Sequence, residues 1–404
     1  MAPADPVPDG GVVERYLRLG LALGRHLDGL VDAYYGPPSW KDEAVAGVPV
    51  ALPALVAAAA RLVADIDGGA EPNLEGRRRR WIRAQVVGLH TVGRSLAGEP
   101  LGYLDEVEAS YGVRPSPVPT DALDAAHRRL DAVLPGSGPV RERMIAWREG
   151  QVVPPDRLEG LVRDLADDLR ERTDRAFGLP AGEQVEWVLE ANKPWSGFNY
   201  YLGDLRSRVA INVDLPVPSL VVPHLVAHEA YPGHHTEHVR KEVGLVRSRG
   251  HLEEAIFLVG TPQCLLAEGL ADLALESLVG PDPEAAMAPH FAAARIPFDA
   301  EVAAEVRDAL GTVQAARGNL ALMLHDEGRT ATDVVAWAER WLLLPTPRAE
   351  KQVAFVSDPT WRAYIFCYTE GVELCRRFVA GDPARFERLL TEQLVPADLV
   401  APAA

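Results

Sequence analysis

The amino-acid sequence predicts a mainly α-helical protein with two helical lobes, a small β-element and a cleft between the lobes. Apolar residues recur at helical spacing through most of the 404 residues. Two short segments, 183–190 (EQVEWVLE) and 206–214 (RSRVAINVD), instead alternate apolar and polar residues, as half-buried strands do. We expect an N-terminal lobe at 1–180, the β-element at 181–218 and a second lobe at 219–404. No linker is long enough to require separate domains, so one continuous domain is the alternative.

Helix boundaries follow from residues that interrupt helices. Residues 12–34 carry apolar side chains at helical spacing and end at Gly36-Pro37-Pro38. Prolines at 115, 117 and 119 and the segment 135–139 (PGSGP) separate later helices. On these grounds we predict further helices at 53–66, 75–97, 119–133, 139–149 and 155–178, and after the β-element at 219–243, 250–278, 283–309, 311–326, 330–342, 359–379 and 382–393.

Charge and cysteine content restrict the classes of partner and compartment. The formal net charge is −17, and an acidic surface repels phosphate, so we expect neither nucleic acid nor a membrane as a partner. Three cysteines in a chain of this length fit a reducing compartment better than a disulfide framework. Residues 1–11 lack the basic and apolar regions of a secretion signal, and prolines interrupt the apolar stretch 44–60. The sequence therefore predicts a soluble cytoplasmic protein.

A cluster of histidines is the strongest chemical signal in the sequence. Five of the eleven histidines fall within residues 224–238. They follow an apolar helical run for which Ser219 is an expected N-cap, with Pro223 in or near the first turn. A buried helix that presents His228 and Glu229, followed by further histidines, is typical of zinc hydrolases.

There are two candidates for the second histidine ligand. Zinc peptidases usually place this histidine four residues after the first one, but here that position, counted from His228, is occupied by Pro232. On a regular helix, His234, six residues after His228, would point about 120° away from the face of His228. His235, seven residues after it, would lie about 10 Å further along the helix axis. Pro232-Gly233 interrupts the helix, so a local bend can return His234 towards His228. We favour His234 and keep His235 as the alternative. His224 shares the face of His228 and is expected beside the site, with ligation as the less favoured option.

The third ligand is expected from the segment 265–272 (LLAEGLAD). Glu268 is an acidic residue within an otherwise apolar helical run, where an unpaired charge is costly and a metal ion would offset the cost. Gly269 would allow another helix to approach closely. Asp272 lies one turn later and could hold a ligand imidazole by its second nitrogen. Three protein ligands leave a fourth position for water, as in catalytic zinc sites.

These motifs resemble those of a large bacterial family that carries no assigned function and whose members are commonly described as zinc metallopeptidases. Its pattern H-E-A-x-P-G-H-H-x-Q corresponds to 228–237 (HEAYPGHHTE), and its E-G-W-A to 268–271 (EGLA). Glu237 and Leu270 replace the family's Gln and Trp. The family is regarded as similar in fold to the thermostable carboxypeptidase (carboxypeptidase Taq) family, which is a two-lobed helical gluzincin. The resemblance extends over about 219–371 and includes Arg317, Leu324-His325 and Tyr368–Gly371.

The resemblance implies a mechanism as well as a fold. It assigns one zinc ion per chain to His228, His234 and Glu268. Glu229 would then be the general base that takes a proton from a zinc-activated water and passes it to the leaving amine. His325 and Tyr368, which lie in the matching segments, would stabilise the oxyanion, with Tyr364 as the alternative tyrosine.

Substrate contacts are expected from the β-element. In gluzincins an edge strand before the metal-bearing helix often pairs with the substrate backbone. This suggests Arg208 and Asn212 on the strand 206–214, and Tyr200 in a loop at 197–201 that would wall the groove. A β-hairpin that only stabilises the lobe is the alternative. The cation for a terminal carboxylate could be Arg206, Arg208, Arg317 or Arg362.

Three functions are compatible with these patterns. The leading hypothesis is a zinc metallopeptidase that hydrolyses small peptides and resembles a carboxypeptidase. A zinc amidase or esterase acting on a small molecule would use the same chemistry on another acyl bond. A non-catalytic metal-binding or scaffold protein is the third. The sequence does not fix the oligomeric state, for which a homodimer is one option.

Overall fold

The computed structural model describes residues 10–193, 195–214, 216–359 and 361–400. The fold is mainly α, with 64% helix and 8% strand, which confirms the predicted fold class. The first part of the chain contains α1 (Val12–Leu23), β1 (Val31–Tyr34), α2 (Pro38–Val45), α3 (Leu52–Asp67), α4 (Gly76–Leu96), α5 (Tyr103–Tyr111), α6 (Thr120–Val133), α7 (Val140–Gly150) and α8 (Pro155–Phe177).

The β-element and the helices that follow it make up the rest. They are β2 (Gln184–Glu190), β3 (Gly197–Gly203), β4 (Arg206–Asn212), α9 (Val221–Glu229), α10 (His234–Lys241), the π-helical η1 (Glu242–Arg247), the 3₁₀ turn η2 (Leu252–Ala255) and β5 (Ile256–Leu258). The C-terminal part contains α11 (Pro262–Val279), α12 (Pro283–Ala293), α13 (Ala300–Ala315), α14 (Gly318–His325), α15 (Ala331–Trp341), α16 (Thr346–Ser357), the π-helical η3 (Cys367–Gly371), α17 (Val372–Val379), α18 (Pro383–Thr391) and α19 (Pro396–Val400).

The three-stranded sheet corrects the expected strand order. Its order is β2-β4-β3, with β2 and β4 parallel and β3 and β4 antiparallel. The strand expected at the edge, β4, is therefore central, and Val209, Ala210 and Ile211 are all fully buried. The segment expected as a loop at 197–201 forms the edge strand β3 instead. Because β4 is hydrogen-bonded on both sides, it cannot pair with a substrate backbone.

Two predicted helices contain strands. The helix predicted at 12–34 ends at Leu23, and residues 31–34 form β1, which pairs antiparallel with β5 inside the helix predicted at 250–278. The apolar run in each segment is short enough to suit either state, and pairing with a distant strand decides it. The helix predicted at 283–309 is likewise divided in two around Pro297, because proline cannot continue a hydrogen-bonded helix.

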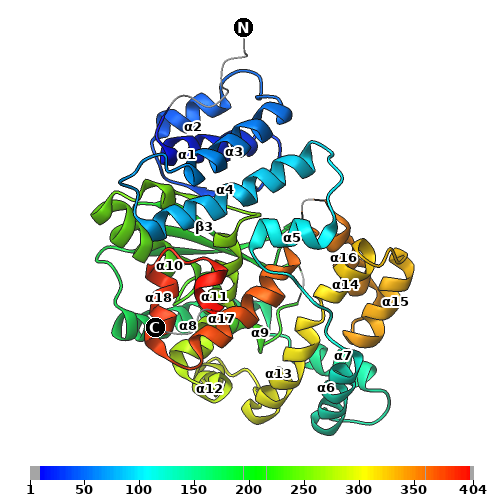
Figure 1. The fold of residues 1–404 in the computed structure, drawn as a ribbon. Helices are drawn as coiled ribbons and strands as arrows, with labels where there is room; N and C mark the ends of the chain where they lie inside the picture. The colour runs from blue at the N-terminus through cyan, green and yellow to red at the C-terminus, as the bar shows by residue number, and fades with distance from the viewer. Residues whose placement is uncertain (1–9, 194, 215, 360, 401–404) are drawn as a thin grey trace.

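The hydrophobic side chains form two cores. One core gathers α1, α3 and α4 with the β5 residues Ile256 and Leu258, at one end of the molecule (Figure 1). The other gathers α5–α8 with the sheet and the later helices. The hydrophobic packing groups α5–α8 with the later helices and not with α1, α3 and α4, so the boundary between the two cores differs from the boundary predicted at 180. Gly88 allows the two parts to approach, since a Cβ there would lie 2.7 Å from the carbonyl oxygen of Gly260.

No helix within the described residues combines the length and the apolar character needed to cross a membrane.

Candidate metal centre

Two short helices and the turn between them bring His228 and His234 together. His228 lies near the C-terminal end of α9, and His234 is the first residue of α10. The turn at 230–233 allows no side chain at its last position, because a Cβ on Gly233 would lie 1.9 Å from the carbonyl oxygen of His228. The two imidazole rings are perpendicular, with centroids 4.7 Å apart. The interruption predicted from Pro232-Gly233 thus places His234, six residues on, beside His228.

Glu268 completes this group from α11. Its carboxylate oxygens lie 3.4 Å from His228 Nε2 and 3.7 Å from His234 Nε2. All three ligand atoms lie within 4.8 Å of one another. Tetrahedral zinc with bonds of 2.0–2.1 Å would separate its ligand atoms by about 3.3 Å, so these spacings suit such an ion.

One carboxylate oxygen of this group has no hydrogen-bond partner. Glu268 Oε2 is buried and has no hydrogen-bond partner. A buried carboxylate oxygen without a partner is costly in a protein interior, and a metal ion would supply the missing contact. The donor set of two imidazoles and one carboxylate is one that zinc commonly takes. The residues present therefore fit a zinc ion.

Neighbouring side chains hold two of the three candidate ligands, His228 and Glu268, in place. Asp272 Oδ1 lies 2.9 Å from His228 Nδ1 and 3.2 Å from His224 Nε2. Because a carboxylate only accepts, Nδ1 of His228 carries the proton and Nε2 faces Glu268. The hydroxyl of Tyr364 donates to Glu268 Oε1 at 2.7 Å. The contact expected for Asp272 is present, and the contact to Glu268 comes from Tyr364, the alternative tyrosine.

Close packing around Gly269 explains how Tyr364 reaches the site. A Cβ on Gly269 would lie 2.4 Å from the carbonyl oxygen of Gly371, and one on Gly371 would lie 2.6 Å from that of Leu265. Two facing glycines therefore allow α11 and the segment around η3 to approach backbone to backbone. The predicted close approach at Gly269 is confirmed.

The electrostatics of the group favour a cation. Burial alone would lower the pKa of His228, but its contacts to Asp272 and Glu268 outweigh this effect and raise the pKa well above its ordinary value. Burial also lowers the pKa of His234 to about 4, so this ring is neutral and free to bind through a nitrogen. The acidic groups thus create a negative field that holds a proton on His228 and would equally favour a metal cation, while His234 offers a neutral nitrogen.

Glu229 lies beside the candidate ligands. Burial, opposed by the charge of His228 and aided by Glu268, raises the pKa of Glu229 to about 7. The strand β3 covers this residue: a Cβ on Gly197 would lie 2.9 Å from the Glu229 carboxylate. The Asn199 amide donates to the Glu229 backbone carbonyl at 2.6 Å. Edge strand β3, and not β4, therefore borders the site.

His235 belongs to a separate buried cluster. Its Nε2 lies 2.8 Å from Glu183 Oε2 and its Nδ1 lies 2.8 Å from Ser207 Oγ. Tyr231 also donates to Glu183 at 2.8 Å, and Arg170 pairs with its other oxygen at 2.6 Å. Both ring nitrogens of His235 are thus engaged away from His228. The structure groups His234, and not the alternative His235, with His228 and Glu268.

The other residues predicted for catalysis and for carboxylate binding divide between two places. Tyr368 packs edge-to-face on Tyr364, with ring centroids 5.3 Å apart, and the Arg317 guanidinium lies 5.8 Å from the centre of the Tyr368 ring. His325 instead lies against Tyr103 and within 2.6 Å of the Val356 carbonyl. In the described part of the chain, no hydrogen bond or ion pair joins His325 to the candidate ligands.

Three residues predicted to contact substrate have other partners in the structure. Side chains alternate along a strand, and Asn199 faces α9, so Tyr200 and its cross-strand neighbour Arg208 face the opposite side. Arg208 pairs there with Glu190. Asn212 donates to the carbonyls of Lys193 and Trp195 and so fixes a loop. These three residues therefore have structural partners. The substrate roles of Arg208 and Asn212 were predicted with β4 at the edge, and that of Tyr200 with 197–201 as a loop, so all three roles stay predictions.

Sequence reasoning missed one carboxylate near the group. Asp32 lies in β1, and its negative charge and that of Glu268 interact. The position of Asp32 depends on the pairing of β1 with β5, which no local pattern in the segment 12–34 indicates.

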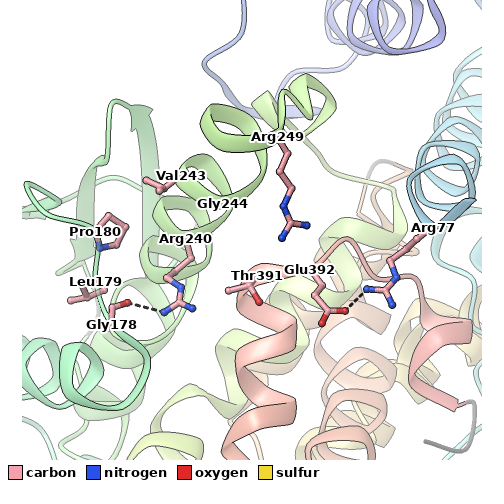
Figure 2. A pocket seen from close by; sticks show the side chains of 10 residues that line it. All are labelled: Arg77, Gly178, Leu179, Pro180, Arg240, Val243, Gly244, Arg249, Thr391 and Glu392. Carbon is pink, nitrogen blue, oxygen red and sulfur yellow. Dashed lines mark hydrogen bonds and ion pairs between the residues drawn. The ribbon is translucent and has the colours of Figure 1, made fainter. Parts of the chain in front are cut away.

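A cavity of about 690 Å³ lies apart from these residues (Figure 2). Three arginines line it, but Arg77 pairs with Glu392 at 2.6 Å and Arg240 donates to the Gly178 carbonyl at 2.9 Å. Its lining within the described ranges contains none of the predicted site residues: Arg77, Gly178, Leu179, Pro180, Arg240, Val243, Gly244, Arg249, Thr391 and Glu392.

Comparison with known proteins identifies the fold alone. No family model matches the sequence, and no curated protein matches it. The chain is similar in structure to a "putative lipoprotein" from Colwellia psychrerythraea, with a TM-score of 0.53 and 13% identity over 96% of this chain and 74% of that one. It is also similar to a "putative lipoprotein of unknown function" from Shewanella oneidensis, with a TM-score of 0.50 and 15% identity over 96% and 72%.

Proposed function

We propose that this chain is a zinc-dependent metallopeptidase that hydrolyses peptide bonds of small peptides in the manner of a carboxypeptidase. One observation carries the proposal: two imidazole nitrogens and a buried carboxylate oxygen without a hydrogen-bond partner converge beside a second buried glutamate. This is the donor set and the neighbouring base that zinc hydrolases use.

The chain's own residues have distinct roles in this proposal. A bound zinc ion would supply an activated water and polarise the scissile carbonyl. Glu229 takes the proton of the attacking water and returns it to the leaving amine, and its raised pKa, about 7, suits both steps. Asp272 orients the His228 ring, and Tyr364 orients the Glu268 carboxylate.

Arg317 is the best candidate for a substrate carboxylate. Its side chain donates to the Gln352 amide oxygen at 3.2 Å, and no carboxylate among the described residues pairs with it. Its guanidinium lies against Tyr368, which in turn packs on Tyr364 beside Glu268. A guanidinium is suited to bind a carboxylate with two parallel hydrogen bonds. Of the four arginines considered, Arg362 is paired with Glu106 and Arg208 with Glu190.

The decisive experiment measures metal and turnover in the same samples. We expect about one zinc per chain by elemental mass spectrometry, and hydrolysis of short unblocked peptides. Glu229→Gln should keep the zinc and lower kcat/KM by roughly 10²- to 10⁴-fold, the usual contribution of a general base. Glu276→Gln, which alters an exposed glutamate of α11, is the matched control and should change neither value.

The remaining outcomes separate the alternative functions. Zinc with hydrolysis of small amides or esters, but not of peptides, would favour the amidase or esterase hypothesis. Zinc without any turnover would favour a binding or scaffold role. No zinc, and none taken up from micromolar solution, would overturn the proposal.

We also propose a cytosolic location. The description of both similar structures as lipoproteins supports the alternative, a lipid-anchored protein outside the cytosol. Cell fractionation with and without detergent distinguishes the two.

A further inference from the structure

Asp32 occupies an irregular position in β1. In the pairing with β5, Val31 lies opposite Leu258 and Ala33 opposite Phe257, so Asp32 is the extra residue of a β-bulge. Bulges are frequent beside active sites, where they redirect a side chain. The bulge at Asp32 therefore places a carboxylate where a regular strand would not.

Both neighbours of β1 lead to the candidate metal centre. Its partner β5 continues within four residues into α11, which carries Glu268. β1 also packs against β3, and the ring of Tyr35, which directly follows β1, lies 5.3 Å from that of Tyr201 in β3. β3 is the strand whose Gly197 faces Glu229. The strand that carries Asp32 thus contacts both the strand that leads to Glu268 and the strand that covers Glu229.

Asp32 has no partner of opposite charge among the described residues. Its side chain forms no hydrogen bond and no ion pair with any of them. Burial first, and the charge of Glu268 second, raise the pKa of Asp32 to about 7, and Asp32 in turn raises that of Glu229. An unpaired acid in such a place is destabilising and is expected to serve a function.

The roles of the neighbouring carboxylates indicate what that function is. Glu268 is a candidate ligand, Asp272 contacts His228, and Glu229 is the proposed general base. Asp32 interacts with Glu268 and Glu229 through its charge, and among the described residues it is left without a counter-charge. A cationic group on the substrate would supply that counter-charge.

We infer that Asp32 binds the free amino group of the substrate, so that the site selects short zwitterionic peptides of two or three residues. Asp32 in β1 would hold the ammonium group and Arg317 the carboxylate, with the scissile bond beside Glu229 between them. A peptide residue spans about 3.5 Å, so only a short peptide places both charged ends within one site of this kind. This inference rests on the proposed peptidase function and specifies its substrate class.

The experiment compares one peptide with its blocked form. Trialanine and N-acetyl-trialanine are offered to the wild-type zinc protein, to Asp32→Asn and to Asp28→Asn, an exposed aspartate in the preceding loop that serves as the control. In the wild type and the control, N-acetylation should lower kcat/KM by roughly 10- to 100-fold, mainly through KM, because a charge-assisted hydrogen bond is lost. Asp32→Asn should lose the same factor on trialanine and nothing further on N-acetyl-trialanine, with zinc content unchanged.

Each possible result bears on one claim. Equal rates on the free and acetylated peptides in the wild type would overturn the inference and leave the peptidase proposal standing. Cleavage of neither peptide would instead count against the peptidase proposal. In that case, calorimetric binding of the two peptides still decides the inference: it requires tighter binding of trialanine to the wild type but not to Asp32→Asn. The wild-type comparison needs no variant, so it holds even if Asp32→Asn fails to fold.

Discussion

Two buried histidine clusters lie side by side in this protein, and consecutive residues, His234 and His235, belong to different ones. His235, Glu183, Ser207 and Tyr231 form a cluster in which each named polar side chain has a hydrogen-bond partner. In the other cluster Glu268 Oε2 has none. The two clusters have similar compositions, but the His235 cluster is fully buried whereas His228 and His234 are partly exposed. Hydrogen-bond satisfaction, together with this exposure, distinguishes a structural cluster from a candidate metal site.

The difference arises from helix geometry. Successive residues on a helix point about 100° apart, so His234 and His235 at the start of α10 face different surroundings. His234 faces α9 and α11, whereas His235 faces the sheet through Ser207 of β4. Neighbouring histidines in a motif can therefore divide ligand and structural roles between them.

Exchanging the two histidines for alanine should separate these roles and gives the largest expected effect. His234→Ala should lose its zinc and its hydrolytic activity completely, because one of only three candidate protein ligands is removed. His235→Ala should keep about one zinc per chain. Its free energy of unfolding should fall by about 2–4 kcal/mol, since Glu183 and Ser207 lose a buried partner and a cavity remains. Elemental mass spectrometry and urea unfolding measure the two quantities.

Zinc should be removed from all samples of the unfolding series, because a ligand that binds only the folded state would add its own stabilisation. Loss of zinc in His235→Ala with a normally folded protein would reverse the assignment of the second ligand. Equal loss of stability in both variants would show that the two clusters do not differ as described.

Local patterns predicted the members of the candidate site well. The adjacent His228 and Glu229, the Pro232-Gly233 interruption and an acidic residue in an apolar helix are all readable within a few residues of sequence. The structure groups His228, His234 and Glu268, and it confirms the mainly α fold. Their ligand roles stay predictions.

Features that depend on distant pairing could not be predicted in this way. The central position of β4 arises because β2 pairs with β4 on the side opposite β3. Asp32 lies near the candidate metal centre because β1, the strand that carries it, pairs with β5. A periodic apolar pattern fixes the type of an element but not its neighbours, so residues placed by strand pairing escape such reasoning.

Asp272 tests how far the metal cluster depends on its supporting contacts. Asp272→Asn should weaken zinc binding by roughly 10- to 100-fold. The reason is that the side-chain amide of asparagine would hold the His228 ring less firmly than the carboxylate does and would make its imidazole a weaker zinc ligand. Competition with a chelator of known zinc affinity measures the change. His224→Ala is the matched control, since it removes the other partner of Asp272 and leaves the contact to His228. A change of the same size in the control would mean that His224 shares the ligand role.

Glu183 tests the structural cluster and gives the smallest expected effect. Burial would raise the pKa of Glu183, but hydrogen bonds from His235 and Tyr231 outweigh it and hold the pKa below its ordinary value. Glu183→Gln should therefore lower the free energy of unfolding at pH 7 by about 1–3 kcal/mol, because an amide group replaces an acceptor that faces only donors. Glu171→Gln, on the exposed ion pair with Arg175, should change it by less than about 1 kcal/mol.

The pH dependence of this effect has a defined sign. A carboxyl group whose pKa is lower in the folded state stabilises the fold above its unfolded pKa, near 4.3 for glutamate, and loses that contribution as the pH falls through the folded pKa. The difference in unfolding free energy between wild type and Glu183→Gln should thus be greatest near pH 7 and narrow below about pH 4. Urea unfolding at pH 7, 5 and 3.5 measures it. A difference that stays constant over this range would mean that Glu183 is already protonated in the folded protein, and that its cluster is held by neutral hydrogen bonds and not by a buried charge.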